Sequence, residues 1–485
     1  MNFTRDVVER RDPTAPALVE LARDGSRRTW AFGEVADRSA RLAGAMQARG
    51  VGRGDVVMTL VGNRPEWVFT MLACFRIGAV VLPCTEQLRA KDLRLRLDVA
   101  GPRLVVADER NRAELSEALE AGAHPDVAYI PDEDLFAAAP APAAELDGDE
   151  PCLITFTSGT AGEPKAVLHA QRYLDGQRLQ AEGWLGGRPG ELVWCTAASG
   201  WSKSARNVFI APWLTGATAL LHDARFDPAE RLELLRAERV NVLCMAPTEY
   251  RVIAKRAALA PLPDLRTLVA AGEALNPEVL RVFQDGLGLD IRDGYGQTET
   301  GQLTGMAPGE RVRPGSMGRP LPGIALSVDD GELVLDDPAT DPTFFLHNLG
   351  EEPPATGAPW RTGDRVRVDD DGFIYFEGRS DDLIISAGYR IGPFEVESAL
   401  VSHAAVAEAA VVAAPDEERG AVVRAVVVLR DGFAPGDDLA AELQEHVRRE
   451  TAPYKYPRIV DFAEALPRTA SGKIKRAELR RTPRP

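Results

Sequence analysis

Residues 154–165 combine the side chains and the backbone freedom that can hold a polyphosphate. They read Ile-Thr-Phe-Thr-Ser-Gly-Thr-Ala-Gly-Glu-Pro-Lys, a strand-like start followed by hydroxyls and glycines that end on Lys165. Phosphate oxygens accept hydrogen bonds from such hydroxyls and bare amides, and they attract a cation. The segment is not a Walker loop, because Lys165 follows Pro164 and no Gly-Lys-Ser/Thr ending is present. Taken alone, a segment of this kind is more often an ordinary loop.

A second glycine-rich segment, residues 293–300, places an aromatic ring, a hydroxyl and a carboxylate close together. It reads Asp-Gly-Tyr-Gly-Gln-Thr-Glu-Thr. Tyr295 can stack on a purine, Thr298 can donate to a phosphate, and Glu299 can bind a Mg²⁺ ion that bridges phosphate oxygens. The alternative is a solvated turn, but the two segments together favour a nucleotide site.

Further polar motifs follow towards the C-terminus. Asp364, in Trp-Arg-Thr-Gly-Asp, could accept both hydroxyls of a ribose. Residues 386–397 read Ser-Ala-Gly-Tyr-Arg-Ile-Gly-Pro-Phe-Glu-Val-Glu, and residues 467–475 carry Lys473 directly after a Ser-Gly turn. By itself, Lys473 would be interpreted as a surface lysine.

The composition excludes several other classes of protein. With 45% hydrophobic and 27% charged residues the chain matches a globular protein, and no apolar stretch is long enough for a signal peptide core or a membrane span. We therefore expect a cytoplasmic protein without membrane insertion. The five cysteines and six histidines are scattered, which argues against a disulfide framework or a zinc site. A net charge of -16 disfavours nucleic acid as a partner.

The elements that must position these motifs are those of an α/β protein. Short β-type runs alternate with amphipathic helical stretches through the first part of the chain, which favours parallel sheets. Residues 267–271 predict a buried strand, and Asn276, Pro277 and Glu278 predict the start of a helix. Asp370-Asp-Gly predicts a hairpin turn, and beyond it we expect a helix at 393–402, strands at 406–413 and 421–429, and a helix through Leu443. Two domains are predicted, residues 1–380 and 381–485.

In this order, the motifs resemble those of the adenylate-forming superfamily, which includes acyl-CoA synthetases, peptide-synthetase adenylation domains and beetle luciferases. The resemblance covers nearly the whole chain, from residues 28–35 to Lys473, and it is nearest to the medium-chain acyl-CoA synthetases. It implies a large N-terminal domain of stacked, mostly parallel sheets with helices and a β-barrel-like subdomain. It also implies a small, mobile α+β C-terminal domain.

The resemblance assigns a role to each matched residue. It implies a phosphate loop for the leaving pyrophosphate, made of Thr157, Ser158, Gly159, Thr160 and Lys165. It implies an adenine site between Gly272 and Glu273 on one side and Tyr295 on the other. It implies that Thr298 contacts phosphate, that Glu299 binds Mg²⁺, and that Asp364 and Arg379 contact the ribose. Finally, it implies that Arg390 contacts phosphate, that Asp381 is the hinge, and that Lys473 bridges the substrate carboxylate and the α-phosphate.

The implied reaction has two halves. A carboxylate first attacks the α-phosphorus of ATP and releases pyrophosphate, with Lys473 and Mg²⁺ neutralising the developing charge. A thiol then attacks the acyl group, and the small domain rotates about Asp381 so that Gly388 lines a pantetheine channel. Coenzyme A is the expected thiol, and an acyl carrier protein in a biosynthetic pathway is the alternative.

The acid is expected to be larger than acetate. Acetate-specific members of the superfamily carry a tryptophan where this chain has Gly296, and residues 198–217 resemble the medium-chain branch, in which Trp201 would gate an acyl tunnel. We therefore expect a medium-chain, branched or aryl acid. Lys203 and Arg206 lie where amino-acid-activating members place an acidic residue, which argues against an α-amino acid and leaves the role of both cations open.

Overall fold

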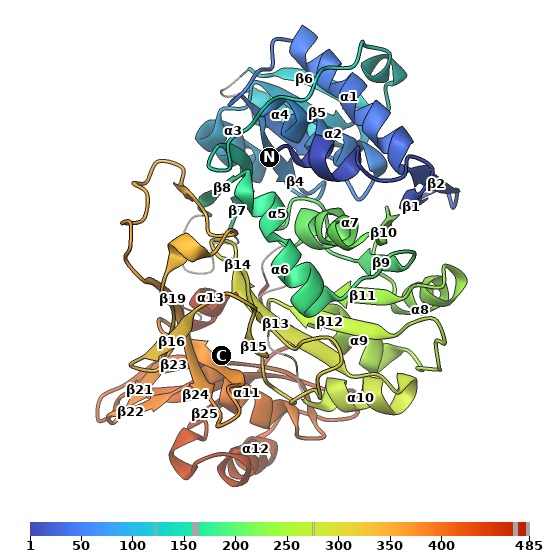
Figure 1. The fold of residues 1–485 in the computed structure, drawn as a ribbon. Coiled ribbons are helices and arrows are strands. Elements are labelled where there is room, and N and C mark those ends of the chain that lie inside the picture. The colour runs from blue at the N-terminus through green and yellow to red at the C-terminus, as the bar shows by residue number, and fades with distance from the viewer. Residues whose placement is uncertain are drawn as a thin grey trace.

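The computed structural model describes residues 1–120, 122, 124–157, 164–273, 275, 277–468 and 474–481. Within this part, two large sheets stack on each other, a small antiparallel sheet lies beside them, and a separate C-terminal domain lies at one end (Figure 1). The expected α/β class is therefore confirmed. No described helix is long and apolar enough to cross a membrane.

The first large sheet is parallel from β7 to its far edge at β6. Its order is β18 (His347–Asn348), β8 (Ala166–Ala170), β7 (Pro151–Phe156), β4 (Val80–Cys84), β3 (Val56–Leu60), β5 (Leu104–Asp108) and β6 (Asp126–Ile130). Side chains alternate across it, so Val57 packs in the layer of α1 (Phe32–Ala48) and α2 (Pro65–Ile77), whereas Met58 packs with α3 (Ala90–Ala100) and α4 (Arg112–Leu119). Both faces are thus covered by helices, as a parallel sheet requires.

The second large sheet carries the central motifs. Its order is β15 (Arg319–Pro320), β14 (Gly301–Gly305), β13 (Ile291–Gln297), β12 (Thr267–Ala271), β11 (Val242–Met245), β9 (Leu192–Cys195), β10 (Thr218–His222), β1 (Pro16–Leu21) and β2 (Arg27–Ala31). The helices α8 (Pro228–Ala237), α9 (Pro247–Arg256) and α10 (Pro277–Leu287) cover its outer face. The predicted strand at 267–271 is β12, and α10 begins at the predicted Pro277, while Asn276 lies outside the described residues.

Short helices fill the layer between the two large sheets. They are α5 (Arg172–Gly176), α6 (Arg178–Gln180), η4 (Ala181–Leu185), η5 (Arg206–Ile210) and α7 (Ala211–Thr215). One continuous apolar core joins this layer to both sheets and includes Val81 of β4, Phe209 of η5 and Val269 of β12. The residues of η5 are all buried. A charged or polar side chain of η5 is therefore withdrawn from solvent.

A third, antiparallel sheet provides two of the candidate site residues. Its order is β16 (Leu326–Asp329), β17 (Glu332–Leu335), β19 (Trp360–Val368) and β20 (Ile374–Arg379). The predicted hairpin turn joins β19 to β20, and Gly372 has the positive φ of 82° that such a turn needs. The strand order runs from β16 at one edge to β20 at the other, and the barrel-like subdomain that the resemblance implies stays a prediction.

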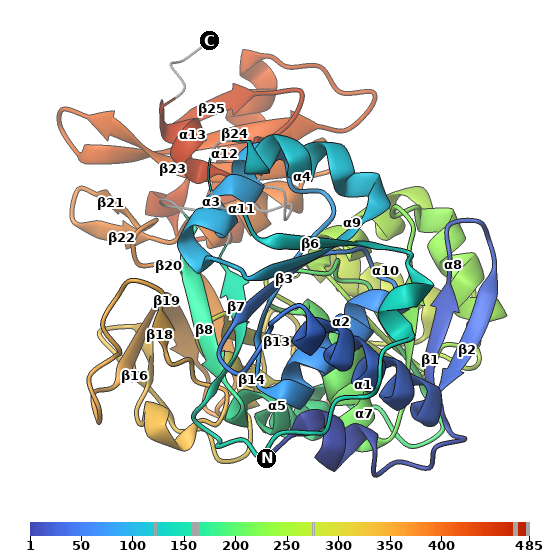
Figure 2. The ribbon, with the colours of Figure 1, turned by 90° about the horizontal axis from the view of Figure 1, so that it is seen from above.

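The elements of the C-terminal domain gather on one side of the molecule (Figure 2), and they enclose a core of their own. It contains β21 (Ile384–Ser386), β22 (Tyr389–Ile391), α11 (Pro393–Val401), β23 (Val406–Asp416), β24 (Gly420–Leu429), α12 (Asp437–Glu450), β25 (Ile459–Phe462) and α13 (Arg476–Arg481). The predicted helix at 393–402 and the strands at 406–413 and 421–429 match α11, β23 and β24. The predicted boundary after residue 380 falls between β20 and β21 and stays a prediction.

The remaining short helices are η1 (Thr4–Val8), η2 (Glu109–Asn111), η3 (Glu133–Phe136), η6 (Pro338–Thr340) and η7 (Pro453–Lys455).

All five cysteines are buried and free of disulfide bonds.

Candidate active site

The first candidate loop joins the ends of β7 and β8. The Thr157 amide donates to the Lys165 carbonyl at 2.9 Å, and the Lys165 amide donates to the Thr157 hydroxyl at 3.0 Å, so the two residues form the base of a closed loop. Lys165 Nζ lies 2.8 Å from Glu351 Oε1. The candidates Ser158, Gly159 and Thr160 lie outside the described residues.

Asp364 is the centre of a buried hydrogen-bonded cluster. Its carboxylate accepts from the Tyr295 hydroxyl, from Gln297 Nε2 at 2.8 Å, and from Arg379 Nη1 at 3.2 Å. Burial raises the pKa of Asp364, while the charge of Arg379 and the donated hydrogen bonds oppose that rise. Burial and the Asp364 charge also raise the pKa of Tyr295, which therefore stays a neutral donor. The cluster joins β13, β19 and β20 and presents a fixed carboxylate.

Glu299 lies just beyond this cluster. Its carbonyl accepts from the Phe345 amide at 2.8 Å, which fixes the turn after β13. Burial raises the pKa of its carboxyl, whereas the positive charges of Arg379 and Lys165 act in the opposite direction. Both cations are therefore close enough to affect the same carboxylate, and the first candidate loop converges on the second. The adjacent Thr298 is half-buried, and its carbonyl accepts a hydrogen bond from His169.

The loop after β12 brings Gly272 and Glu273 to the same region. Gly272 has a φ of 102°, and a Cβ atom there would overlap the Lys203 ammonium, which donates to the neighbouring Ala271 carbonyl. Glu273 accepts from the Thr248 hydroxyl at 3.1 Å and pairs with Arg251. Burial acts to raise the pKa of Glu273, but the Arg251 charge outweighs it and the pKa is lowered. This carboxylate therefore stays ionised.

Gly296 has a structural reason to be glycine. A Cβ atom at this position would overlap the Gly301 carbonyl across the β13–β14 pair. The expectation that Gly296 leaves room for a larger acid stays a prediction, because the close backbone approach alone requires glycine. Trp201, the expected gate, is half-buried, and its carbonyl accepts from the Ser204 hydroxyl at 2.6 Å.

The C-terminal domain approaches these loops. Asp381 lies 3.2 Å from Arg379 Nε, so the expected hinge begins directly at the Asp364 cluster. Burial acts to lower the pKa of Arg476, but the carboxylates Glu397, Asp382 and Glu273 raise it overall. Residue 476 is thus near enough to the loop after β12 to respond to Glu273. Lys473 and the Arg390 side chain lie outside the described residues.

Gly388 lies on the turn between β21 and β22. It has a φ of 83°, and a Cβ atom there would meet open space. The neighbouring Tyr389 ring is 52% exposed and stacks on Tyr454, with 4.4 Å between the ring centroids. The turn is therefore free to face another surface.

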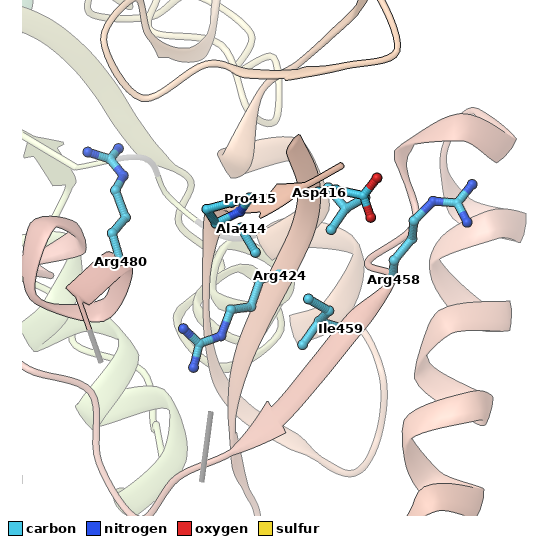
Figure 3. Close-up of a pocket in the computed structure, with 8 residues that line it drawn as sticks. Ala414, Pro415, Asp416, Arg424, Arg458, Ile459 and Arg480 are labelled. Carbon is cyan, nitrogen blue, oxygen red and sulfur yellow. The ribbon is translucent and has the colours of Figure 1, made fainter. Parts of the chain in front are cut away.

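A separate hollow of about 570 Å³ lies on the C-terminal domain, among Asp416, Arg424, Arg458 and Arg480 (Figure 3). Arg424 pairs with Asp461, and Arg480 pairs with Asp382. None of the candidate residues that the structure describes lines this hollow, so we do not assign the reaction to it.

Several partners of the candidate residues were missed by sequence reasoning. Gln297 stands inside a quoted motif and could have been proposed as a second donor to Asp364. Glu351 and Arg251 carry no sequence signal, because each meets its partner only through the fold.

Comparisons with known proteins agree with this arrangement. Residues 5–338 match the AMP-binding enzyme family, and residues 395–473 match the AMP-binding enzyme C-terminal domain. The chain is 38% identical to the uncharacterized acyl-CoA ligase YtcI of Bacillus subtilis, over 96% of this chain and 92% of that one. It is 37% identical to human acyl-coenzyme A synthetase ACSM4, mitochondrial, over 99% of this chain and 90% of that one.

The fold agrees as well. The structure of the anthranilate CoA ligase AuaEII in complex with anthranoyl-AMP matches with a TM-score of 0.88 and 27% identity, over 98% of this chain and 96% of that one. The fold and the site define an adenylate-forming ligase. The chain belongs to the AMP-binding enzyme family, and the relatives named above are an acyl-CoA ligase and an acyl-coenzyme A synthetase. The resemblance and the predicted enzyme class, an AMP-forming acid–thiol ligase, are thereby confirmed.

Proposed function

We propose that the chain converts a carboxylic acid larger than acetate, of medium-chain, branched or aryl type, into its CoA thioester through an acyl-adenylate. ATP supplies the AMP group and pyrophosphate leaves. The observation that carries the proposal is the convergence of Lys165, Glu299 and Arg379 beside the buried Asp364 cluster. Those groups suit a nucleoside triphosphate, because two cations can bind its phosphates and a fixed carboxylate can accept hydrogen bonds from its sugar.

The nucleotide roles follow from this arrangement. Asp364 accepts from the ribose hydroxyls, with its geometry held by Tyr295, Gln297 and Arg379. Gly272, Glu273 and the Tyr295 ring form the adenine site. Thr157, Ser158, Gly159, Thr160 and Lys165 hold the β- and γ-phosphates, with Thr298 and Arg390 as further phosphate contacts.

Magnesium is part of the proposal, with Glu299 as its protein ligand. Among the described residues there is no cluster of three or more His, Cys, Asp or Glu side chains that could hold a metal by themselves. This fits Mg²⁺, which is commonly bound by one or two carboxylates together with substrate phosphates. When bound, the ion neutralises charge on the phosphate oxygens.

The small domain supplies the remaining groups in turn. Lys473 places a cation between the carboxylate and the α-phosphate during adenylation. Rotation about Asp381 then withdraws Lys473 from the acyl group and brings Gly388 to the pantetheine channel. Through this channel the CoA thiol reaches and attacks the acyl carbonyl. The proximity of Arg476 to Glu273 supports the first arrangement for the conformation described here. A cytoplasmic location is part of the same proposal.

An acyl carrier protein is the second candidate for the thiol, because both acceptors end in phosphopantetheine. One experiment tests both. A panel of carboxylic acids is incubated with ATP and Mg²⁺, with and without CoA, while pyrophosphate and thioester are measured. Acid-dependent pyrophosphate release followed by CoA thioester formation supports the proposal. Pyrophosphate release without a CoA thioester favours the carrier protein, and no release with any acid refutes both.

A further inference from the structure

Arg206 is a buried cation that forms no ion pair with any described residue. It opens η5 in the layer between the two large sheets, and its side chain is 3% exposed. Its Nε and Nη1 atoms are shielded from solvent and have no hydrogen-bond partner, and no ion pair within the described part of the chain includes it. A buried guanidinium with unpaired donors and no counter-charge is costly to desolvate. Such a group is retained where a partner arrives from outside.

The two ring side chains next to Arg206, His169 and Tyr173, are neutral. Burial and the Arg206 charge lower the pKa of His169 to about 3, so its imidazole carries no charge at neutral pH. Burial raises the pKa of Tyr173, which stays a phenol although the Arg206 charge and a hydrogen bond with Arg206 act in the opposite direction. The charge of Asp341 also acts on Tyr173. Asp341 Oδ1 accepts from the Thr343 amide at 2.8 Å and the Thr343 hydroxyl at 2.7 Å, whereas its Oδ2 is buried without a hydrogen-bond partner, and no ion pair joins Asp341 to Arg206 within the described residues.

The position of Arg206 connects it to the proposed reaction centre. The centroids of the His169 and Tyr173 rings are 4.2 Å apart, and His169 donates a hydrogen bond to the Thr298 carbonyl. The His169 side chain therefore lies between the surroundings of Arg206 and the proposed phosphate loop after β13. Three residues before Arg206, Lys203 reaches the Ala271 carbonyl beside Gly272. Residues 203–206 therefore connect two proposed nucleotide loops: Lys203 contacts the loop after β12, and Arg206 lies behind His169, which contacts the loop after β13.

We propose that Arg206 determines substrate specificity by binding a second carboxylate, at the far end of the acid, so that the substrate class is a dicarboxylic acid activated at one end. This inference rests on the proposed function and narrows its acid. A carboxylate satisfies a guanidinium fork with two parallel hydrogen bonds and also neutralises its charge. A site built around a buried polar group rejects an analogue that lacks the matching group, because the buried donors are then left unpaired.

The test compares two matched series of acids. Straight-chain monocarboxylates and α,ω-dicarboxylates of about four to ten carbons are assayed by pyrophosphate release at saturating ATP. We expect one or more dicarboxylates to exceed the monocarboxylate of equal length by about 100-fold in kcat/KM. Arg206→Met should remove that preference, mainly through KM, and Arg206→Lys should restore only part of it because the planar fork is lost. A preference of the wild-type enzyme for the unsubstituted acids overturns the inference without any variant.

A matched control separates specificity from stability. Arg292 is also buried, but its guanidinium donates to the Met306 carbonyl at 3.0 Å. Arg292→Met should lower the melting temperature and leave the ratio between the two acid series unchanged. Equal loss of both series in Arg206→Met would assign Arg206 a structural role and refute its role in specificity.

A binding measurement distinguishes failure of the anion site at Arg206 from failure of the proposed enzymatic function. Calorimetry measures the affinity of the best dicarboxylate for wild-type enzyme and for Arg206→Met. Tighter binding to the wild type without pyrophosphate release would refute the proposed function and keep the anion site. Equal binding together with normal pyrophosphate release from monocarboxylates would refute the anion site and keep the function.

Discussion

Arg430 of the C-terminal domain lies 3.1 Å from Glu278 in the first turn of α10. A second contact between the same two parts runs from Lys255 Nζ to the Ala407 carbonyl at 2.8 Å. These bonds stabilise the present arrangement of the domains. The charge of Glu273, in the loop after β12, also acts on Arg476, and on the function proposed above this arrangement would be the one that supports adenylation.

Removing the Arg430 side chain should therefore slow adenylation selectively. We expect Arg430→Ala to reduce acid-dependent pyrophosphate release by up to about fivefold, the limit for an exposed ion pair, and to spare thioester formation from supplied acyl-adenylate. Arg448→Ala is the control, because it removes an equivalent pair with Glu445 inside the domain. An equal effect on both half-reactions would contradict the assignment.

Lys473 is expected to act in only one of the two half-reactions. Lys473→Ala should lower pyrophosphate release by several orders of magnitude, because no other proposed cation bridges the carboxylate and the α-phosphate. Thioester formation from supplied acyl-adenylate should largely survive. Lys475→Ala tests whether any lysine in this segment matters, and it should leave both steps near wild type. Equal loss of both steps in Lys473→Ala would refute the two-arrangement mechanism.

The Tyr295 hydroxyl positions Asp364 for the ribose. Tyr295→Phe keeps the ring and removes the hydrogen bond, so we expect the KM for ATP to rise about tenfold while the KM for the acid changes little. Tyr375→Phe is a matched control, because its hydroxyl donates to Asp369 at 3.0 Å in the same sheet and outside the proposed site. Steady-state kinetics with ATP as the varied substrate measures the difference. An unchanged KM for ATP would argue against the ribose role of Asp364.

Gly388 is expected to matter only when the thiol arrives. Gly388→Leu should leave pyrophosphate release in the absence of CoA intact and reduce CoA thioester formation by about tenfold or more, because a branched side chain would narrow the pantetheine channel. Gly25→Leu controls for backbone strain, since Gly25 has a similar φ of 82° and also faces open space. Loss of pyrophosphate release in Gly388→Leu would place the effect outside the channel.

Asp293 makes stability depend on pH. Burial raises its pKa from 3.8 to about 8 in the folded chain, so the folded state retains a proton that the unfolded state has lost between these values. The free energy of unfolding should therefore fall as pH rises through this window, by up to about 1.4 kcal/mol per unit. Asp293→Asn should flatten that slope in urea titrations at pH 5 to 8. The exposed Asp290→Asn should leave the slope unchanged, and a wild-type slope in Asp293→Asn would refute the argument.

The sequence predicted the architecture well where local patterns and motif order carry it. The strand at 267–271, the start of α10 at Pro277 and the hairpin before β20 all follow from short-range rules. The order of the motifs was enough to identify the superfamily. Such signals depend on neighbours in the chain, and the sequence displays those directly.

The contacts that complete the site could not be predicted in the same way. Lys165 pairs with Glu351, and Arg251 pairs with Glu273, only because the sheets bring distant segments together. Arg206 lies where a polar segment, residues 202–207, passes into an apolar run, residues 208–214, and nothing in its neighbours shows whether its charge is exposed, paired or isolated. Its burial is a property of the layer between two stacked sheets. Side-chain environments of this kind require the three-dimensional structure.

The burial of all five cysteines has a practical consequence for assays. A chromogenic disulfide reagent reacts with accessible thiolates, and the native chain shields its own thiols. When the reagent is added to samples withdrawn from a reaction of enzyme, ATP, acid and CoA, its signal therefore reports the CoA thiol that remains. The fall of this signal from sample to sample follows thioester synthesis, without a radioactive label and with little background from the enzyme.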